Sequence, residues 1–251
     1  MNLRLALSTI IIPATIAISA ATDTLTIATY NIRNCIGMDM TQDIDRTAKA
    51  IQTFEADIIA VQEVDSCTHR SKGIDILGQL ASRTDMTATY SSAIDFDGGR
   101  YGIGILSKEQ PIAVKHIQLP GREEARTAVI AEFDDYVFCC THLSLTDEDR
   151  ILSTEILRPI LSGYDKPVFF AGDLNSHPSD PAIKMLCNNG MRIISPGSPT
   201  YPADTPEEQI DYIMTTAGDN NVKIIRSYIP DEPIASDHRP IISEIIIMSN
   251  K

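Results

Sequence analysis

The chain has 251 residues, a length that suits one large domain better than two. Its 21 basic and 34 acidic residues give a formal net charge of −13 at pH 7. This balance does not favour a protein that holds nucleic acid through a basic surface, although a bound metal ion could supply a local positive field to an acidic chain.

The N-terminal residues have the pattern of a secretory signal peptide. Arg4 is the only charged residue among the first 22, an apolar run follows from Leu5 to Ile18, and the small residues Ser19-Ala20-Ala21 come next. The alternative is a retained membrane anchor, but a run of about 14 apolar residues that contains Pro13 is short for a bilayer span of roughly 20. We therefore predict that residues 1–21 are removed. The remaining domain, 22–251, is then periplasmic or secreted, with no stable membrane insertion after cleavage.

Removing the signal peptide also removes Arg4, so the 21 basic residues become 20 against 34 acidic ones and the net charge becomes −14. The mature chain would keep five cysteines, at positions 35, 67, 139, 140 and 187. Their number is odd and no C-x-x-C pair occurs, so neither a complete disulfide framework nor a zinc site is indicated. The sequence allows one disulfide without fixing its partners, and it predicts that Cys139 and Cys140 are buried thiols.

Strands dominate the chain up to residue 141. Helices are predicted at 43–54, where Ile44, Ala48 and Ile51 share one face, and around 74–81. The run 57–61 is continuously apolar, which is typical of a strand that is covered on both sides. Strands are predicted at 25–30, 57–61, 86–92, 102–107, 111–118, 126–133 and 136–141.

The second half alternates helices and strands. A helix is predicted from Thr146, where Thr146-x-x-Asp149 matches a capping box, with Leu152, Ile156 and Ile160 facing inward and Pro159 kinking or closing it. A short helix is predicted at 182–186. Strands are predicted at 168–171, 210–215, 222–228 and 241–248. No glycine-rich nucleotide motif opens a helix. The order predicts one α/β domain, a four-layer α/β/β/α sandwich of two mixed sheets flanked by helices.

Polar clusters stand where the predicted strands end, which is a rigid way to assemble a site. Each residue also has an ordinary structural interpretation, such as a turn for Asp173 and Asn175 or a satisfied core histidine for His142. The clusters are Tyr30-Asn31-Ile32-Arg33, Gln62-Glu63-Val64-Asp65, Thr141-His142-Leu143, Gly172-Asp173-Leu174-Asn175, Gln209-Ile210-Asp211-Tyr212 and Ser236-Asp237-His238-Arg239-Pro240.

Taken together, these motifs resemble the endonuclease/exonuclease/phosphatase family, which includes deoxyribonuclease I-like nucleases, inositol polyphosphate 5-phosphatases and sphingomyelinases. The resemblance covers essentially all of 24–249, and Ser236-Asp237-His238-Arg239-Pro240 is its most specific part. Three further stretches resemble a compact bacterial branch of the family: Gln62-Glu63-Val64-Asp65, Arg70-Ser71-x-Gly73 and Gly98-Gly99-Arg100-Tyr101-Gly102. The chain departs from that branch at Ile103, where an asparagine often stands.

The resemblance implies a metal site. Glu63 would hold a divalent cation, with Asn31 and Asp237 as further oxygen donors. Hard oxygen ligands suit Mg²⁺ or Mn²⁺. Asp173 would either orient and deprotonate the attacking water or act as another ligand, and the number of metal ions stays open.

The resemblance also implies the groups that bind the phosphate. Asn175 would position the phosphate or a second ion. Asp211 would fix the tautomer of His238 and favour its cationic form, so that His238 donates to the phosphate, as His142 would from across the pocket. We add Arg100, Arg126 and Tyr101 as candidate phosphate contacts, with ordinary surface residues as the alternative.

These roles predict a monomeric, metal-dependent hydrolase of phosphate esters. The acidic chain has no basic-aromatic segment that would follow a nucleic-acid backbone, so a small or lipid-derived phosphoester is favoured and a secreted nuclease is the alternative. The chain has no Trp and no obvious membrane-inserting hairpin, which weighs against direct action on bilayers. An inactive binding scaffold is the third hypothesis. It is disfavoured because Asn31, Glu63, His142, Asp173, Asn175, Asp211, Asp237 and His238 are all present.

Overall fold

The computed structural model describes residues 24–218 and 220–248, so the predicted signal peptide lies outside the described residues. The first sheet follows the order β11-β12-β1-β2-β4-β3 and is mixed, because β1 pairs with β2 in parallel and with β12 antiparallel. Its strands are β1 (Thr24–Asn31), β2 (Ile58–Ser66), β3 (Thr87–Phe96), β4 (Gly99–Ser107), β11 (Val222–Tyr228) and β12 (Ile241–Ile247).

The second sheet follows the order β5-β6-β7-β8-β10-β9. Like the first sheet, it is mixed: β7 and β8 form a parallel pair at its centre, and the other neighbouring strands are antiparallel. Its strands are β5 (Ala113–Leu119), β6 (Arg126–Glu132), β7 (Val137–His142), β8 (Val168–Asp173), β9 (Arg192–Ile193) and β10 (Asp211–Thr215).

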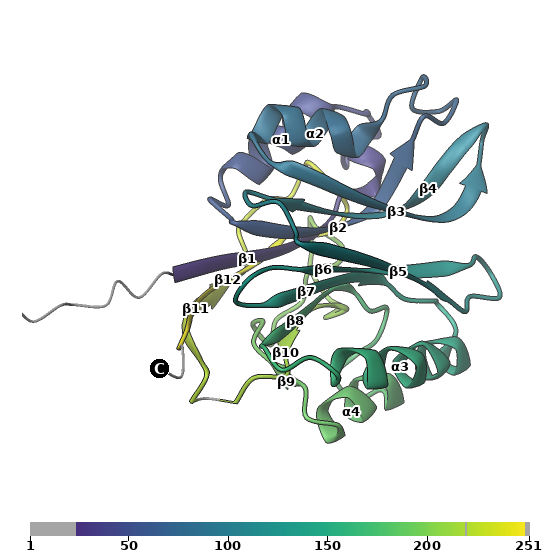
Figure 1. The fold of residues 1–251 in the computed structure, drawn as a ribbon. Helices are drawn as coiled ribbons and strands as arrows, with labels where there is room; N and C mark the ends of the chain where they lie inside the picture. The colour runs from purple at the N-terminus through teal and green to yellow at the C-terminus, as the bar shows by residue number, and fades with distance from the viewer. Residues whose placement is uncertain (1–23, 219, 249–251) are drawn as a thin grey trace, which may run out of the picture.

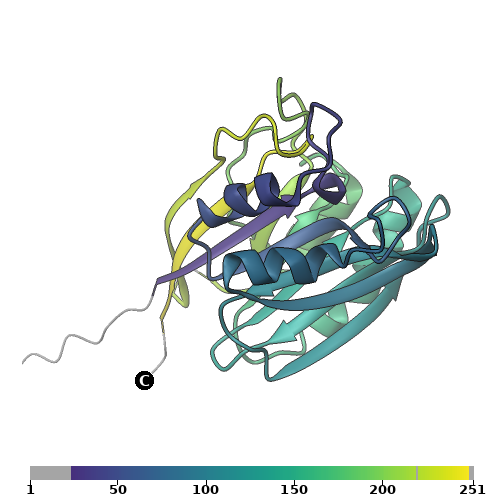
Figure 2. The same cartoon turned by 90° about the horizontal axis from the view of Figure 1, so that it is seen from above.

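Helices cover the outer faces of the two sheets, with α1 and α2 on the first and α3 and α4 on the second (Figures 1 and 2). Their bounds are α1 (Ile44–Gln52), α2 (Ile76–Thr84), α3 (Asp147–Leu161) and α4 (Pro181–Asn188), and a short 3₁₀ turn spans Arg33–Cys35. Three apolar cores separate the four layers: one between the sheets, one under α1 and α2, and one under α3 and α4. The predicted four-layer sandwich is confirmed.

Strand alternation carries polar side chains into the space between the sheets. Successive residues of a strand point to opposite faces, so residues two or four positions apart share a face. The core between the sheets contains Ile27, Phe138, Phe169 and Ile213. The residues in phase with them at the ends of β1, β7, β8 and β10 are Asn31, His142, Asp173 and Asp211. The apolar runs therefore place these four polar residues at one end of the inner space.

Gly172 allows β7 and β8 to approach closely just before Asp173. A Cβ atom at this position would lie 1.9 Å from the backbone oxygen of Thr141 on the neighbouring strand. Any larger residue would push apart the two strands that carry His142 and Asp173, which are register partners. The close approach of β7 and β8 therefore requires glycine at the position before Asp173.

Two predictions about helix α3 are wrong. Leu152 and Ile156 are 46% and 39% exposed, and the buried side instead carries Asp149, Arg150, Ser153, Thr154, Leu157 and Leu161. The capping box does not form either. Thr146 makes no side-chain cap to its own helix, and Asp149 accepts hydrogen bonds from the backbone N–H and guanidinium of Arg122. The helix thus packs Leu157 and Leu161 into the core under α3 and α4, with Asp149 bonded to Arg122 on the same buried side. Pro159 lies inside α3, which ends two residues later at Leu161.

The cysteines form no disulfide. Cys35, Cys139 and Cys140 are buried, and Cys67 and Cys187 are exposed, all five as free thiols. The prediction that Cys139 and Cys140 are buried is confirmed. Among the described residues, no helix is long and apolar enough to cross a membrane.

Candidate active site

Asn31 joins the two sheets at the end of the sandwich. Its amide Nδ2 donates to Glu63 Oε1 at 3.0 Å in the first sheet and to Asp173 Oδ2 at 3.1 Å in the second. Its Oδ1 accepts the backbone N–H of Arg33 at 3.1 Å. In this arrangement Asn31 serves as a donor to two carboxylates, and its oxygen is turned toward the backbone.

Glu63 reaches the site through a break in the strand register. The sequence predicted that β2 ends near Val61, but the strand continues to Ser66 with a bulge between Val61 and Val64. Glu63 has a left-handed φ of 58° at this bulge, and bulges redirect side chains in this way. Burial raises the pKa of Glu63, and the negative charges of Asp237 and Asp173 raise it further against the hydrogen bond from Asn31.

The second sheet brings three predicted residues into adjacent positions. His142 on β7 and Asp211 on β10 are both register partners of Asp173 on β8. His142 Nε2 lies 3.5 Å from Asp173 Oδ2. Burial lowers the pKa of His142 to about 4, although Asp173 pulls it the other way. His142 is therefore a neutral imidazole at pH 7.

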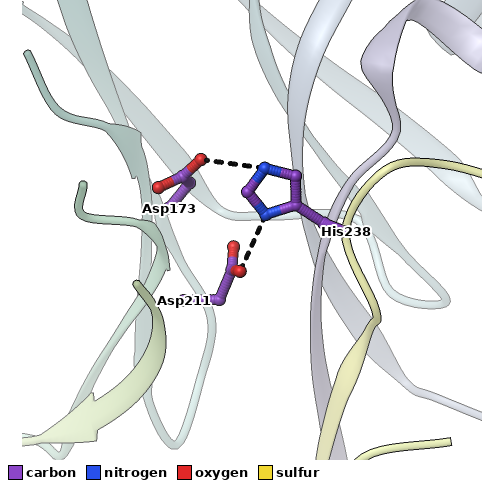
Figure 3. Close-up of side chains that lie close together, drawn as sticks. All are labelled: Asp173, Asp211 and His238. Carbon is purple, nitrogen blue, oxygen red and sulfur yellow. Dashed lines mark hydrogen bonds and ion pairs between the residues drawn. The ribbon is translucent and has the colours of Figure 1, made fainter. Parts of the chain in front are cut away.

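His238 arrives from the loop before β12 and lies between two carboxylates, as Figure 3 shows. Its Nδ1 is 2.9 Å from Asp211 Oδ2, and its Nε2 is 3.7 Å from Asp173 Oδ2. Burial alone would lower the pKa of His238, but Asp211, Asp173 and Asp237 outweigh it and raise the pKa to about 10. The two histidines of the site thus differ in charge at pH 7, with His238 cationic and His142 neutral.

Asp173, Asp211 and His238 also offer ligand atoms that all lie within 4.8 Å of one another. A metal bound among them would have to displace the proton that His238 and Asp211 share at 2.9 Å. In addition, Thr200 Oγ1 donates to the same oxygen of Asp211 at 2.5 Å. We therefore interpret these three residues as a charged group in which Asp211 fixes His238 by a hydrogen bond and Asp173 forms an ion pair with it, rather than as a metal cage.

Asn175 and Asp237 lie at the edge of this group. Asn175 has a left-handed φ of 46°, donates its backbone N–H to Asp173 Oδ1 at 3.0 Å, and donates its Nδ2 to the Leu143 carbonyl at 2.9 Å. Asp237 Oδ2 lies 3.3 Å from Arg33 Nε. Asn175 therefore braces Asp173 and the segment after His142, and Asp237 faces a positive side chain.

The candidate phosphate contacts differ in their surroundings. Burial raises the pKa of Tyr101, and the charge of Glu63 adds to this, so the phenol lies near the cluster. Arg126 is buried and contacts Glu123 at 3.2 Å and Glu124 at 3.3 Å, so two carboxylates already neutralise it. Arg100 is 66% exposed and lies 3.9 Å from Asp95. Within the described part of the chain, Arg100 makes no hydrogen bond or ion pair with the cluster, so the structure does not bring it into the site.

Three contacts of the cluster were not predicted. Thr200 binds Asp211, the ring of Tyr201 lies 4.8 Å from that of His238, and Arg33 pairs with Asp237. Arg33 stands inside the stretch Tyr30-Asn31-Ile32-Arg33 and could have been found there. Thr200 and Tyr201 lie on a long loop between β9 and β10, where the sequence carries no comparable signal.

A divalent cation fits beside Glu63. Glu63 is a partly buried carboxylate whose pKa is raised by burial and by the charges of Asp237 and Asp173, against the opposing effects of Asn31 and His238, and a cation would relieve the repulsion among these carboxylates. Glu63 and Asp237 offer oxygen ligands, which suit Mg²⁺ or Mn²⁺. These residues therefore fit the predicted metal, while the amide oxygen of Asn31 is turned away from Glu63 in this arrangement.

Comparison with protein families agrees with the fold. A model of the endonuclease/exonuclease/phosphatase family matches residues 28–238, so the chain belongs to this family. Its members are hydrolases that act on phosphoester bonds. The predicted family is confirmed. A search of curated proteins found no match.

Solved structures with the same fold have low sequence identity. An endonuclease/exonuclease/phosphatase from Bacteroides vulgatus has a TM-score of 0.74 and 19% identity, over 90% of this chain and 100% of the other. A mannosyl-6-phosphatase from Bacteroides thetaiotaomicron has a TM-score of 0.70 and 16% identity, over 89% and 100% of the two chains. The human Nocturnin catalytic domain has a TM-score of 0.68 and 15% identity, over 90% and 95%.

Proposed function

We propose that this protein is a divalent-metal-dependent phosphoesterase, in which water attacks the phosphorus of a small or lipid-derived phosphate ester. We also propose that it acts in the periplasm or outside the cell after loss of residues 1–21. One observation carries the proposed reaction: Asp173 lies within 3.7 Å of both His142 and His238, at the edge where β1, β7 and β8 end and β10 begins. A carboxylate between two imidazoles of different charge can serve both a water molecule and a phosphoryl group.

Each side chain has a distinct part in this proposal. Asp173, held by Asn31 and by the backbone of Asn175, orients the water and accepts its proton. His238, held as a cation by Asp211, donates a hydrogen bond from Nε2 to a phosphoryl oxygen. Neutral His142 donates to a second oxygen. A bound Mg²⁺ or Mn²⁺ at Glu63 would supply neutralisation of charge on the phosphoryl and leaving oxygens.

The acidity of the chain supports a substrate smaller than a nucleic acid. The formal charge is −13, and the carboxylates of Glu123 and Glu124 occupy Arg126 beside Tyr101. A long polyanion would meet this negative charge along its whole length, whereas one phosphate group would meet only the site. The monomeric state stays a prediction.

The metal dependence is tested with Glu63→Gln, which keeps the shape of the side chain and removes its charge. Without the carboxylate, cation binding should weaken and the metal-stimulated turnover should fall by about 10²–10³, because a metal contributes several kcal/mol to charge stabilisation. The assay measures Mg²⁺ and Mn²⁺ binding by calorimetry. It then measures hydrolysis of a phosphomonoester, a phosphodiester, inositol phosphates, sphingomyelin, RNA and plasmid DNA.

The control is Glu155→Gln, which changes an exposed glutamate on α3 and should leave both readouts unchanged. Preferential cleavage of DNA or RNA would favour a nuclease over the proposed small substrate. A folded chain that neither binds metal nor cleaves any substrate would favour the binding scaffold. Full metal-stimulated turnover by Glu63→Gln would contradict the assigned metal ligand.

A further inference from the structure

Asp65 and Arg70, two residues of the family-like stretches, form a clamp next to Glu63. Asp65 has no exposed surface and lies two residues after Glu63 on β2. Its two oxygens accept Arg70 Nε and Nη2, both at 2.7 Å, and Oδ2 also accepts the hydroxyl of Thr68 at 2.7 Å. Two parallel N–H···O bonds to a buried carboxylate fix both the position and the plane of a guanidinium group.

Two aromatic rings hold the same guanidinium group. Arg70 Cζ lies 4.5 Å from the ring centroid of Phe96 and 5.6 Å from that of Tyr101, which are distances typical of cation–π contact. The backbone N–H of Arg70 also donates to Asp97 Oδ2 at 2.7 Å. The segment after β2 is therefore joined to the β3–β4 hairpin through side chain and backbone alike.

Gly98 and Gly99 allow this contact between the segment and the hairpin. A Cβ on Gly98 would lie 2.3 Å from the ring of His69, and a Cβ on Gly99 would lie 2.4 Å from the backbone oxygen of Ser66. Gly98 also has a φ of 79°, which favours glycine. These glycines thus let the hairpin tip pack directly on the segment that carries Arg70.

One guanidinium nitrogen of Arg70 is not paired with Asp65. Asp65 uses Nε and Nη2, and within the described part of the chain Nη1 has no hydrogen-bond partner. The side chain is 41% exposed. The hydrogen bonds that Arg70 donates to Asp65 raise the pKa of Arg70, and the nearby carboxylate of Glu63, the proposed metal ligand, raises it further. Arg126 differs, because Glu123 and Glu124 pair with its two Nη atoms and its remaining donor, Nε, is buried.

We propose that Arg70 is a substrate-binding residue whose Nη1 donates to a phosphoryl oxygen of the ester, and this proposal rests on the proposed function. The contact with Asp65 explains why Arg70 is suited to this role. An arginine that is already fixed by a buried carboxylate and two rings loses little conformational entropy when the phosphate binds. Of the three arginines near Tyr101, Arg70 combines a fixed plane with an unpaired donor on a partly exposed side chain, whereas the unpaired Nε of Arg126 is buried.

The test uses Arg70→Lys, which keeps the charge but loses the fork and the planar stacking. Binding of inorganic phosphate is measured by calorimetry in excess Mg²⁺, and folding is checked by near-ultraviolet circular dichroism. Phosphate should bind about tenfold more weakly than to the native protein, the equivalent of one charge-assisted hydrogen bond. The matched control is Arg122→Lys, since Arg122 is paired through Nε and Nη2 with Asp149 and, within the described residues, makes no hydrogen bond or ion pair with the cluster, so phosphate affinity should not change.

A second variant keeps the test decisive if Arg70→Lys fails to fold. Phe96→Leu changes a ring that is 37% exposed and leaves Arg70 in place, and it should weaken phosphate binding about two- to fivefold through the loss of stacking. Native phosphate affinity in the folded Arg70→Lys protein would overturn the proposal, as would native affinity in Phe96→Leu or the absence of phosphate binding by the native protein. Turnover is not needed for this titration, so a failure of the proposed reaction would be seen separately in the substrate panel.

Discussion

Replacing His238 with glutamine is expected to lower kcat/KM by about 10³-fold while the protein stays folded. The loss corresponds to one positioned donor aimed at developing charge, at the upper end of the range for such groups. His238 is 4% exposed and Asp211 holds it at 2.9 Å, so its cation is fixed before the substrate arrives. Glutamine keeps an N–H donor but cannot carry the charge. Steady-state kinetics on the preferred substrate measure the effect.

His177→Gln is the control, because His177 is a half-exposed histidine that lies 3.7 Å from Glu208 and, within the described residues, makes no hydrogen bond or ion pair with the cluster. The pH profile gives a second readout. The pKa of His238 is raised to about 10, so its cation is present at neutral pH and is lost only as the pH rises through that value. A His238→Gln enzyme with native kcat/KM would remove His238 from the mechanism.

Asp173→Asn is expected to lower kcat by about 10²- to 10⁴-fold, the range for loss of a general base. Asparagine has nearly the same shape and can still contact Asn31 and His142, so the fold should survive. It cannot accept a proton from water. Because Asp173 also helps to keep His238 cationic, the alkaline limb of the pH profile should move to lower pH in any residual activity.

The control for this variant is Asp135→Asn, an exposed aspartate in the turn between β6 and β7. It should leave kcat unchanged. If Asp173→Asn kept most of its kcat, the proton would have to leave the water by another route, and Asp173 would at most position other groups.

The strands could be predicted because each core strand has its own pattern of apolar residues. In β8, Phe169 and Ala171 enter the core between the sheets, and strand alternation then directs Asp173 the same way. The same logic applies to Asn31 and His142. Helix α3 could not be oriented in this way. Leu152 and Ile156 form a regular apolar stripe, but the buried side of α3 carries Leu157 and Leu161, with Asp149 bonded to Arg122.

The bulge at Glu63 and the contacts of the loop residues could not be predicted from the apolar pattern of single strands. A bulge depends on pairing with β4, which is distant in sequence, and Thr200 meets Asp211 only after two sheets have packed. The contacts of the arginines could not be predicted for the same reason. Arg100 and Arg126 stand beside promising residues in the chain, whereas Arg70 reaches Tyr101 through the hairpin contact.

Hydrolysis in ¹⁸O-labelled water tests the central claim most directly. The native protein is incubated in labelled water with Mg²⁺ and the best substrate of the panel. The masses of both products are then measured by mass spectrometry. Attack of water on phosphorus predicts one ¹⁸O atom in the phosphate-containing product of each turnover and none in the released alcohol. Label in the alcohol, or no metal-dependent hydrolysis of any phosphoester, would contradict the account.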